Sequence, residues 1–155
     1  MRLEYDVFET RFGWMGLEAS SKGLRHTTLP RTSPDECISE LYGDSHIATE
    51  SGTGFHDLED KLISYFEGHP VDFTEEAIDI TDSPPFHQAA WIACRSIPVG
   101  ETRPYKWLAI KAGNPRAVRA AGQAMARNRL PIIVPCHRVV ASDGRLRGFG
   151  RESGQ

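Results

Sequence analysis

The sequence predicts an α+β protein with two domains, a small α+β domain over residues 1–82 and a mainly helical domain over residues 86–155. Apolar residues alternate with polar ones through the first thirty positions, which is typical of strands. From residue 86 onward apolar residues recur three and four positions apart, which is typical of helices. Between these regions an acidic stretch ends in Ser83-Pro84-Pro85, and this shift in composition indicates a domain boundary.

The first half begins with predicted strands. They are expected over three ranges: 3–7, 12–17 and 24–29. The polar run 20–23 ends in glycine and predicts a hairpin turn between the second and third strands. Pro34, at the first helical position after Ser33 as N-cap, predicts a short helix that Gly43 ends. The polar residues 44–54 are expected to form a loop.

A second helix is predicted from Phe55 onward, because apolar residues return at helical spacing until Gly68 and Pro70 end the pattern. Residues 71–73 are expected to form a short strand. No cluster of residues in this half indicates a chemical reaction, so a scaffold role is expected for it.

The second half opens with a predicted helix over residues 86–96. Five of its residues are spaced to face a core: Phe86, Ala89, Ala90, Ala93 and Ile97. Thr102 is expected to cap a second helix over residues 105–112, which Gly113 ends. Asn114 is expected to cap a third helix over residues 115–127. Two helices joined by a tight Gly-Asn turn predict a helix-turn-helix.

Charge is divided unevenly along the chain, whose formal net charge is −3. Residues 1–85 hold 6 Lys and Arg against 18 Asp and Glu, a balance of −12, whereas residues 86–155 hold 12 against 3, a balance of +9. A basic half made mostly of arginine is typical of a surface that meets a polyanion such as nucleic acid. Attraction between the two halves is the alternative interpretation.

The third predicted helix of the second half combines small residues with arginines. Ala120 and Gly122 let a helix approach another surface closely, and Arg116 and Arg119 supply charge. These features favour DNA contact over an ordinary alanine-rich bundle helix. Because such a helix has few long polar side chains with which to read bases, sequence-tolerant seating in the minor groove is expected, and a sequence-specific transcription factor is disfavoured.

Three cysteines occur at wide spacing, Cys37, Cys94 and Cys136. An odd count argues against a disulfide framework, and the absence of a Cys-x-x-Cys pair leaves a zinc site unsupported, so no metal is expected. Cys37 and Cys94 have no basic neighbour in sequence that would lower a thiol pKa. Both are therefore expected to be small buried residues.

Cys136 has different neighbours. Pro131 and Pro135 bracket three β-branched residues, so a stiff, extended segment is expected to lead into this cysteine. His137 and Arg138 follow it, and a thiolate needs nearby positive charge or a base in order to form at neutral pH. From these residues alone, a reactive nucleophile and an inert buried cysteine both remain open.

The run Pro135-Cys136-His137-Arg138-Val139 resembles the active-site signature of the O6-alkylguanine-DNA alkyltransferases, also called methylated-DNA–protein-cysteine methyltransferases. The resemblance extends almost continuously over residues 86–149, including 97–102, 113–120 and 128–139. It implies a ribonuclease-H-like N-terminal domain. It also implies direct-reversal DNA repair, in which an alkyl group, chiefly methyl, passes from O6 of a flipped-out guanine to the cysteine in a single turnover.

The resemblance also implies roles for individual residues. Cys136 accepts the alkyl group, and His137 takes the thiol proton through a water. Tyr105 donates a hydrogen bond to a ring nitrogen of guanine, and Asn128 fixes the turn before the active-site segment. Arg119 fills the gap left in the base stack, on a DNA-binding surface that includes Arg116, Ala120 and Gly122. The implied substrate pocket consists of Met125, Pro131, Val134, Val139, Phe149, Gly150 and Arg151. No cofactor is implied, because the lesion is the alkyl donor.

Two departures from the family pattern lie near the end of the chain. Members continue past the turn at Gly148-Phe149-Gly150 into a helix whose glutamate orients the histidine. This sequence stops at Gln155, so either its C-terminus is truncated or the chain works without that helix. Arg151 stands where some members have glycine, and its bulk predicts better handling of methyl than of benzyl lesions.

The expected partner is double-stranded DNA carrying O6-alkylguanine. The protein is expected to be a monomer that does not contact a membrane. The N-terminus lacks the basic-then-apolar layout of a secretion signal, so a cytoplasmic location, or a nuclear one in a eukaryote, is expected. The alternative function is a non-catalytic module that binds alkyl lesions without repairing them.

Overall fold

The computed structural model describes residues 2–42, 48–51 and 54–141. The chain divides into two compact units, a first unit of Met1–Asp79 and a second unit of Ile80–Gln155. Within the described residues, no helix has the length and apolar character needed to cross a membrane.

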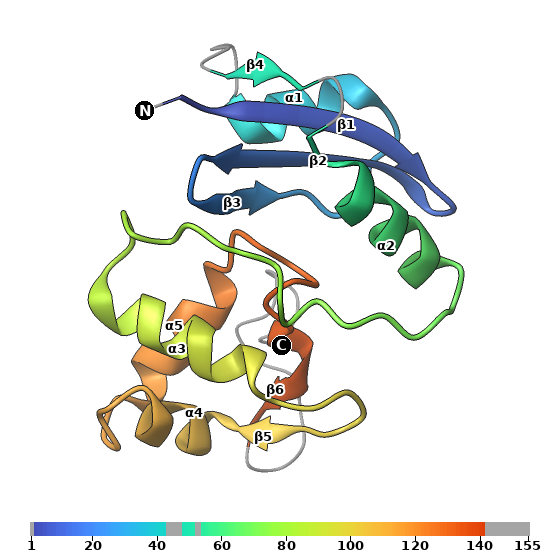
Figure 1. Ribbon diagram of the computed structural model, residues 1–155. Coiled ribbons are helices and arrows are strands. Elements are labelled where there is room, and N and C mark those ends of the chain that lie inside the picture. Colours follow the sequence, from blue (N-terminus) through green and yellow to red (C-terminus); the bar gives the residue numbers. More distant parts are fainter. Residues whose placement is uncertain (1, 43–47, 52–53, 142–155) are drawn as a thin grey trace. The chain divides into compact units, whose positions relative to one another are not determined.

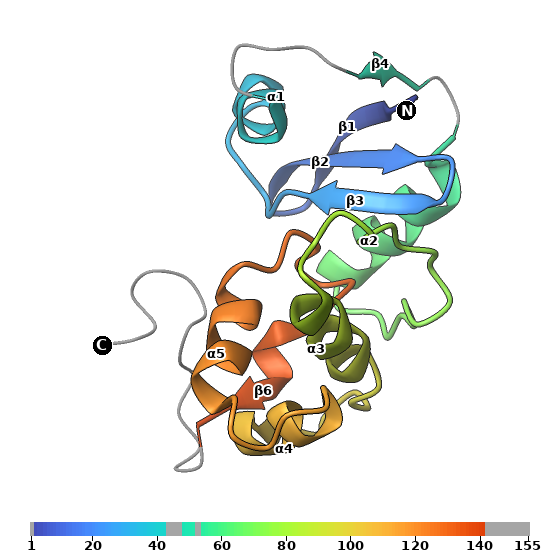
Figure 2. The same cartoon turned by 90° about the vertical axis from the view of Figure 1, so that its left-hand side faces the viewer.

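The first unit is built on a four-stranded sheet in the order β3-β2-β1-β4. Its strands are β1 (Glu4–Thr10), β2 (Gly13–Ser20), β3 (Gly23–Thr27) and β4 (Thr49–Glu50). The first three are antiparallel neighbours and lie side by side in Figures 1 and 2, whereas β4 is parallel to β1. The predicted hairpin at residues 20–23 is present between β2 and β3, so the first three predicted strands are confirmed, although β3 ends at Thr27 rather than at Leu29.

Gly23 is required at the second hairpin. Its φ is +144°, and a Cβ added there would lie 2.6 Å from the carbonyl carbon of Ala77, so a side chain would collide with backbone. The Leu24 N–H donates to the Ala77 oxygen at 2.9 Å. Residues near the end of the first unit are therefore hydrogen-bonded to β3.

Two helices cover opposite faces of this sheet. Helix α1 (Pro34–Tyr42) packs on the face of Gly16, where an added Cβ would lie 3.2 Å from Cβ of Cys37. The Glu36 N–H donates to Ser33 Oγ at 3.2 Å, which confirms the predicted cap. Helix α2 (His56–Phe66) packs on β1 and confirms the second predicted helix.

Two expectations for the first unit were wrong. The loop predicted over residues 44–54 contains β4, whose Thr49 N–H donates to the Leu3 oxygen at 3.0 Å, so pairing with β1 overrides the polar local sequence. Residues 71–73 form no strand. Asp72 instead accepts hydrogen bonds from the backbone N–H and hydroxyl of Thr74, at 2.9 and 2.7 Å, and this local turn competes with an extended ladder.

The second unit is mainly helical. Its elements are α3 (Pro85–Arg95), β5 (Arg103–Pro104), α4 (Tyr105–Lys111), α5 (Val118–Ala126), the 3₁₀ helix η1 (Cys136–Arg138) and β6 (Val139–Val140). Helices α4 and α5 contact each other across the turn at Gly113, whose φ is +102°. The α+β fold class with a helix-turn-helix in its second half is confirmed.

Helix starts in the second unit differ from the expectations. Helix α4 begins at Tyr105 without a side-chain cap, because Arg103–Pro104 pairs as strand β5 and separates Thr102 from the helix. Helix α5 begins at Val118, since Asn114 Oδ1 accepts the Arg116 N–H at 3.1 Å and closes a turn ahead of the helix.

The core-facing side of α3 is also shifted from the expectation. Ala90 and Ile97 are buried as predicted, together with Trp91 and Cys94. Phe86, Ala89 and Ala93 are only half-buried. The apolar stripe therefore includes the large Trp91 side chain, which the spacing argument left out.

Candidate active site

A tightly bonded turn leads into Cys136. The Asn128 side chain accepts the Leu130 N–H at 2.9 Å through Oδ1 and donates to the Val134 oxygen at 2.8 Å through Nδ2. The Val134 N–H donates to the Leu130 oxygen at 2.8 Å, which closes the loop on itself. One asparagine thus holds both ends of the segment before the cysteine.

The same segment carries a strained residue. Ile132 has a φ of +77°, and it is the one non-glycine residue with positive φ among those described. A β-branched side chain is unfavourable in this left-handed region. The expectation of a continuously extended run into Cys136 was therefore wrong, because the chain turns at Ile132 while Asn128 holds the flanking backbone.

Cys136 begins η1 and is 4% exposed. Burial raises the pKa of its thiol, while a hydrogen bond from Asn128 and the backbone N–H groups of Cys136 and His137 lower it. The groups that lower this pKa are those that would stabilise a sulfur anion. The resting thiol is therefore protonated, and the neighbouring N–H groups favour its anion.

His137 and Arg138 diverge after the cysteine. His137 is exposed, and desolvation together with the nearby charge of Arg138 lowers the pKa of its imidazole, so the ring is neutral at pH 7. Arg138 Nη1 donates to the Ile97 oxygen at 2.8 Å, which ties η1 to the end of α3. A neutral imidazole can accept a proton, whereas Arg138 is committed to the scaffold.

Cys94, in the last turn of α3, lies close enough to Cys136 for charge on one thiol to affect the other. Burial and the Cys136 thiolate raise the pKa of Cys94 to about 12, against a smaller opposing effect of Arg138. Cys94 is fully buried, as predicted for a small core residue. Its proximity to Cys136 was missed because nothing in the sequence links the two positions.

Tyr105 reaches this region through strand pairing. It is the first residue of α4 and is 6% exposed. Strand β5, directly before it, pairs in parallel with β6, in the register Arg103 with Val139 and Pro104 with Val140. Because β6 directly follows η1, this pairing brings the Tyr105 and Cys136 segments to the same part of the unit.

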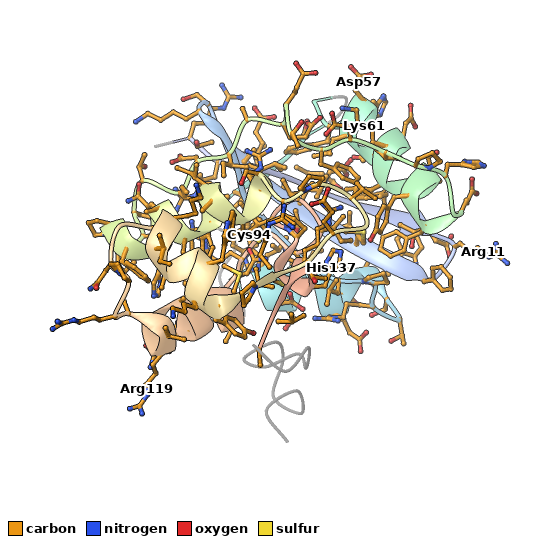
Figure 3. The ribbon with its side chains drawn as sticks, turned by 90° about the horizontal axis from the view of Figure 1, so that it is seen from below. Arg11, Asp57, Lys61, Cys94, Arg119 and His137 are labelled. Carbon is orange, nitrogen blue, oxygen red and sulfur yellow. The ribbon has the colours of Figure 1, made fainter. Side chains whose placement is uncertain are left out.

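The predicted DNA surface lies on and before α5. Arg116 and Arg119 are exposed, and Arg119 projects outward in Figure 3. Ala120 and Gly122 are half-buried, and a Cβ added at Gly122 would meet no atom within 4 Å. Ala121, Ala124 and Met125 form the buried side of the helix. Gly122 therefore leaves open space that a ligand backbone could approach.

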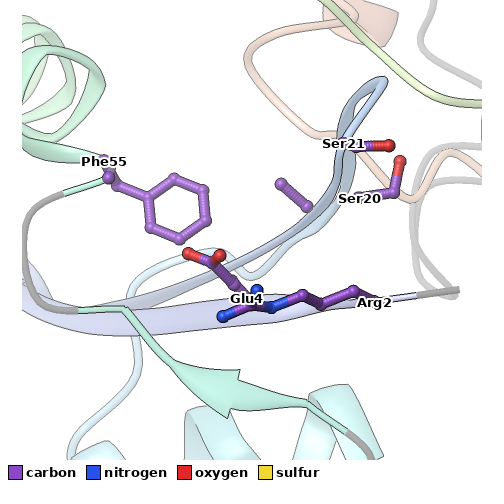
Figure 4. Close-up of a pocket in the computed structure, with 7 residues that line it drawn as sticks. Arg2, Glu4, Ser20, Ser21 and Phe55 are labelled. Carbon is purple, nitrogen blue, oxygen red and sulfur yellow. The ribbon is translucent and has the colours of Figure 1, made fainter.

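The predicted substrate pocket is described only in part. Met125, Val134 and Val139 are buried, and Pro131 is half-buried. Phe149, Gly150 and Arg151 lie outside the described residues. A pocket in the first unit contains none of the expected residues, and Figure 4 shows its lining, which includes Arg2, Glu4, Ser20, Ser21 and Phe55. No cluster able to hold a metal ion occurs among residues 2–42, 48–51 and 54–141.

Comparison with known proteins agrees with the signature around Cys136. Residues 85–155 match the family model described as "6-O-methylguanine DNA methyltransferase, DNA binding domain". A methylated-DNA–protein-cysteine methyltransferase of Methanosarcina barkeri is 37% identical over 94% of this chain and 87% of the relative. The enzyme of the same name from Mycolicibacterium paratuberculosis is 40% identical over 96% of this chain and 84% of the relative.

Solved structures agree with the sequence matches. The O6-methylguanine methyltransferase of Mycobacterium tuberculosis superposes with a TM-score of 0.74 at 32% identity, covering 96% of this chain and 84% of that one. The DNA complex of the M. tuberculosis OGT protein gives a TM-score of 0.73 at 30% identity, over 92% and 82% of the two chains. The chain therefore belongs to the methylated-DNA–protein-cysteine methyltransferase family.

Proposed function

We propose that this chain repairs DNA by direct reversal, taking an alkyl group, chiefly methyl, from O6 of guanine onto the sulfur of Cys136. A sulfur–carbon bond forms as the carbon–O6 bond breaks. The thiol proton leaves Cys136, and the released guanine gains a proton on its ring nitrogen, so atoms and charge balance. The thioether is stable, so each molecule acts once.

The observation that carries this proposal is the turn that Asn128 bonds at both ends directly before Cys136. A buried sulfur normally stays a neutral thiol, but here the Asn128 amide and two backbone N–H groups favour the anion. His137, neutral at pH 7, takes the thiol proton through a water. The thiolate then forms inside a shielded site, where its attack on carbon does not compete with bulk solvent.

Tyr105 assists the leaving group in this proposal. Its hydroxyl donates to the guanine ring nitrogen as negative charge develops on the departing base. The support is its position, because β5 and β6 fasten Tyr105 to the segment that follows Cys136. Since the charge appears only as the carbon–O6 bond breaks, this donor stabilises the transition state more than the bound lesion.

DNA binds along α5 in this proposal. Arg116 and Arg119 contact the duplex, and Arg119 occupies the space left by the flipped guanine. Ala120 and Gly122 allow a close approach of the DNA backbone, which the open space at Gly122 supports. Since its substrate is cellular DNA, we place the protein in the cytoplasm, or in the nucleus of a eukaryote.

One experiment tests transfer against the binding-only alternative, which the names of the relatives do not favour. The protein is incubated with a duplex carrying one O6-methylguanine, and the masses of protein and DNA are measured. Transfer predicts that the protein gains one methylene unit in mass as the DNA loses it, and that Cys136→Ser abolishes both changes. Tight, lesion-selective binding without any mass change would contradict transfer and support a binding module.

A further inference from the structure

The residue directly after Asn128 is held from two sides. Arg129 forms a two-pronged ion pair with Asp82, with Nη2 3.1 Å from Oδ1 and Nη1 3.3 Å from Oδ2. Its guanidinium carbon also lies 5.8 Å from the centre of the Trp91 ring. Planar guanidinium groups suit both of these contacts, and the two together restrict where residue 129 can lie.

Both partners of Arg129 are themselves anchored in the second unit. Trp91 is 2% exposed, and its Nε1 donates to the Ala124 oxygen in α5 at 2.8 Å. Asp82 precedes Ser83, whose oxygen accepts a hydrogen bond of 2.7 Å from Gln88 Nε2 on α3. The Arg129 guanidinium therefore bridges α3 and the segment that leads into it.

The position of Arg129 matters because of its neighbour. Asn128 bonds the Val134 oxygen and the Leu130 N–H through one amide group, and these two bonds shape the turn that leads into Cys136. A shift of the backbone at residues 128–129 would distort both of these bonds and, with them, the turn that presents the sulfur. Since hydrogen bonds weaken steeply with poor geometry, a small shift would be enough to change the reactivity of the thiol.

Global stability is a poor explanation for this arrangement. The side chains of Arg129 and Asp82 are 29% and 44% exposed, and partly exposed ion pairs contribute little to the free energy of unfolding. A geometric effect on the adjacent Asn128 turn requires no large stabilisation. It requires only that residue 129 be held in one place.

We propose that Arg129, held between Asp82 and Trp91, is a positioning residue that keeps the Asn128 turn, and through it the Cys136 sulfur, in place. The inference deepens the proposed function, on which it rests for its consequence in alkyl transfer. Asp82 and Trp91 act through Arg129, and none of the three contacts the reacting atoms.

Asp82→Asn separates positioning from simple electrostatics. Removing a negative charge would by itself favour the Cys136 thiolate and lower its pKa. Loss of the Arg129–Asp82 ion pair would instead loosen the Asn128 turn and raise the pKa of the Cys136 thiol. The two explanations therefore predict shifts of opposite sign in the pH dependence of thiol alkylation.

The experiment follows iodoacetamide labelling of the Cys136 peptide by mass spectrometry as a function of pH, in the whole chain. For Asp82→Asn we expect the midpoint to rise by ~0.5 pH unit and alkyl transfer to slow by about 3-fold to 10-fold. Arg129→Lys keeps the charge but loses the two-pronged geometry, and the same upward shift is expected. Glu101→Gln is the matched control, because it breaks a 2.7 Å ion pair with Arg103 elsewhere in the unit and should leave the midpoint unchanged.

Thermal melts of each variant report the integrity of the fold. A lowered or unchanged midpoint in both Asp82→Asn and Arg129→Lys would overturn the positioning role. Iodoacetamide labelling needs no DNA, so the midpoint shift tests the positioning role independently of repair. A wild-type protein that fails to demethylate DNA would contradict the proposed function alone.

Discussion

The side-chain Nδ2 of Asn128 donates a 2.8 Å hydrogen bond to the carbonyl oxygen of Val134, two residues before Cys136. The same side chain accepts the Leu130 N–H and lowers the pKa of the Cys136 thiol. One amide therefore shapes the backbone that presents the sulfur and affects the acidity of the sulfur itself.

Replacing Asn128 with alanine is expected to impair both properties. Two backbone groups of the buried residues Leu130 and Val134 would lose their partner, which costs about 1–3 kcal/mol of unfolding free energy. The pKa of Cys136 would rise, because a group that lowers it is gone, so iodoacetamide labelling would need a higher pH. The control is Asn114→Ala, which removes an exposed turn contact to the Arg116 N–H. Equal effects of the two substitutions on labelling would count against the assigned role of Asn128.

The positive φ of Ile132 predicts that glycine is tolerated better than alanine at this position. Glycine adopts the left-handed region without the cost of about 1–2 kcal/mol that a Cβ incurs, so Ile132→Gly should be more stable than Ile132→Ala by ~0.5–1 kcal/mol. At the neighbouring buried Ile133 the order should reverse. Chemical denaturation of the four variants measures both differences, and the same order at both positions would show that Ile132 is not strained.

The carboxyl group of Glu59 predicts a pH-dependent stability in the first unit. Burial and its contact with Asp6 raise the pKa of Glu59 to about 8. The folded state therefore holds a proton that the unfolded chain releases near pH 4.5, so the stabilisation present below pH 4.5 is lost as pH rises through 8. Glu59→Gln should gain stability relative to wild type between pH 5 and pH 8, as measured by denaturant unfolding. Asp57→Asn, an exposed change on the same helix, should show no such trend.

Open space at Gly122 predicts a variant that folds well but binds DNA poorly. Since a Cβ there would meet no atom within 4 Å, Gly122→Leu should fold normally. Its melting temperature should not fall, because glycine inside a helix costs ~1 kcal/mol relative to good helix formers. The larger side chain would hold the DNA backbone away from α5. Fluorescence anisotropy with a lesion duplex should show weaker binding than for Gly122→Ala. Unchanged affinity for Gly122→Leu would place the duplex elsewhere.

The sequence predicted most of the helices and the antiparallel strands, because their patterns are local. The signature around Cys136 indicated the family for the same reason, since its residues are contiguous. Strand β4 was missed because its pairing depends on the distant edge of β1. The start of α5 was misplaced because Asn114 caps a turn rather than a helix.

Long-range geometry around Cys136 was not predictable in the same way. The left-handed turn at Ile132 contradicts the preference of a β-branched residue and is held by bonds from Asn128. The proximity of Cys94 and the clamp on Arg129 join α3 to segments far along the chain. Such contacts leave no periodic pattern in the sequence, so only the folded chain reveals them.

Peptide mass spectrometry shows whether one methyl group moves from guanine to the sulfur of Cys136. After incubation with an excess of O6-methylguanine duplex, the protein is digested and the peptides holding Cys37, Cys94 and Cys136 are compared. Transfer to Cys136 predicts one methyl per molecule on the Cys136 peptide, none on the other two, and plain guanine in the DNA. A methyl group on Cys94, or unmodified Cys136 beside repaired DNA, would contradict it.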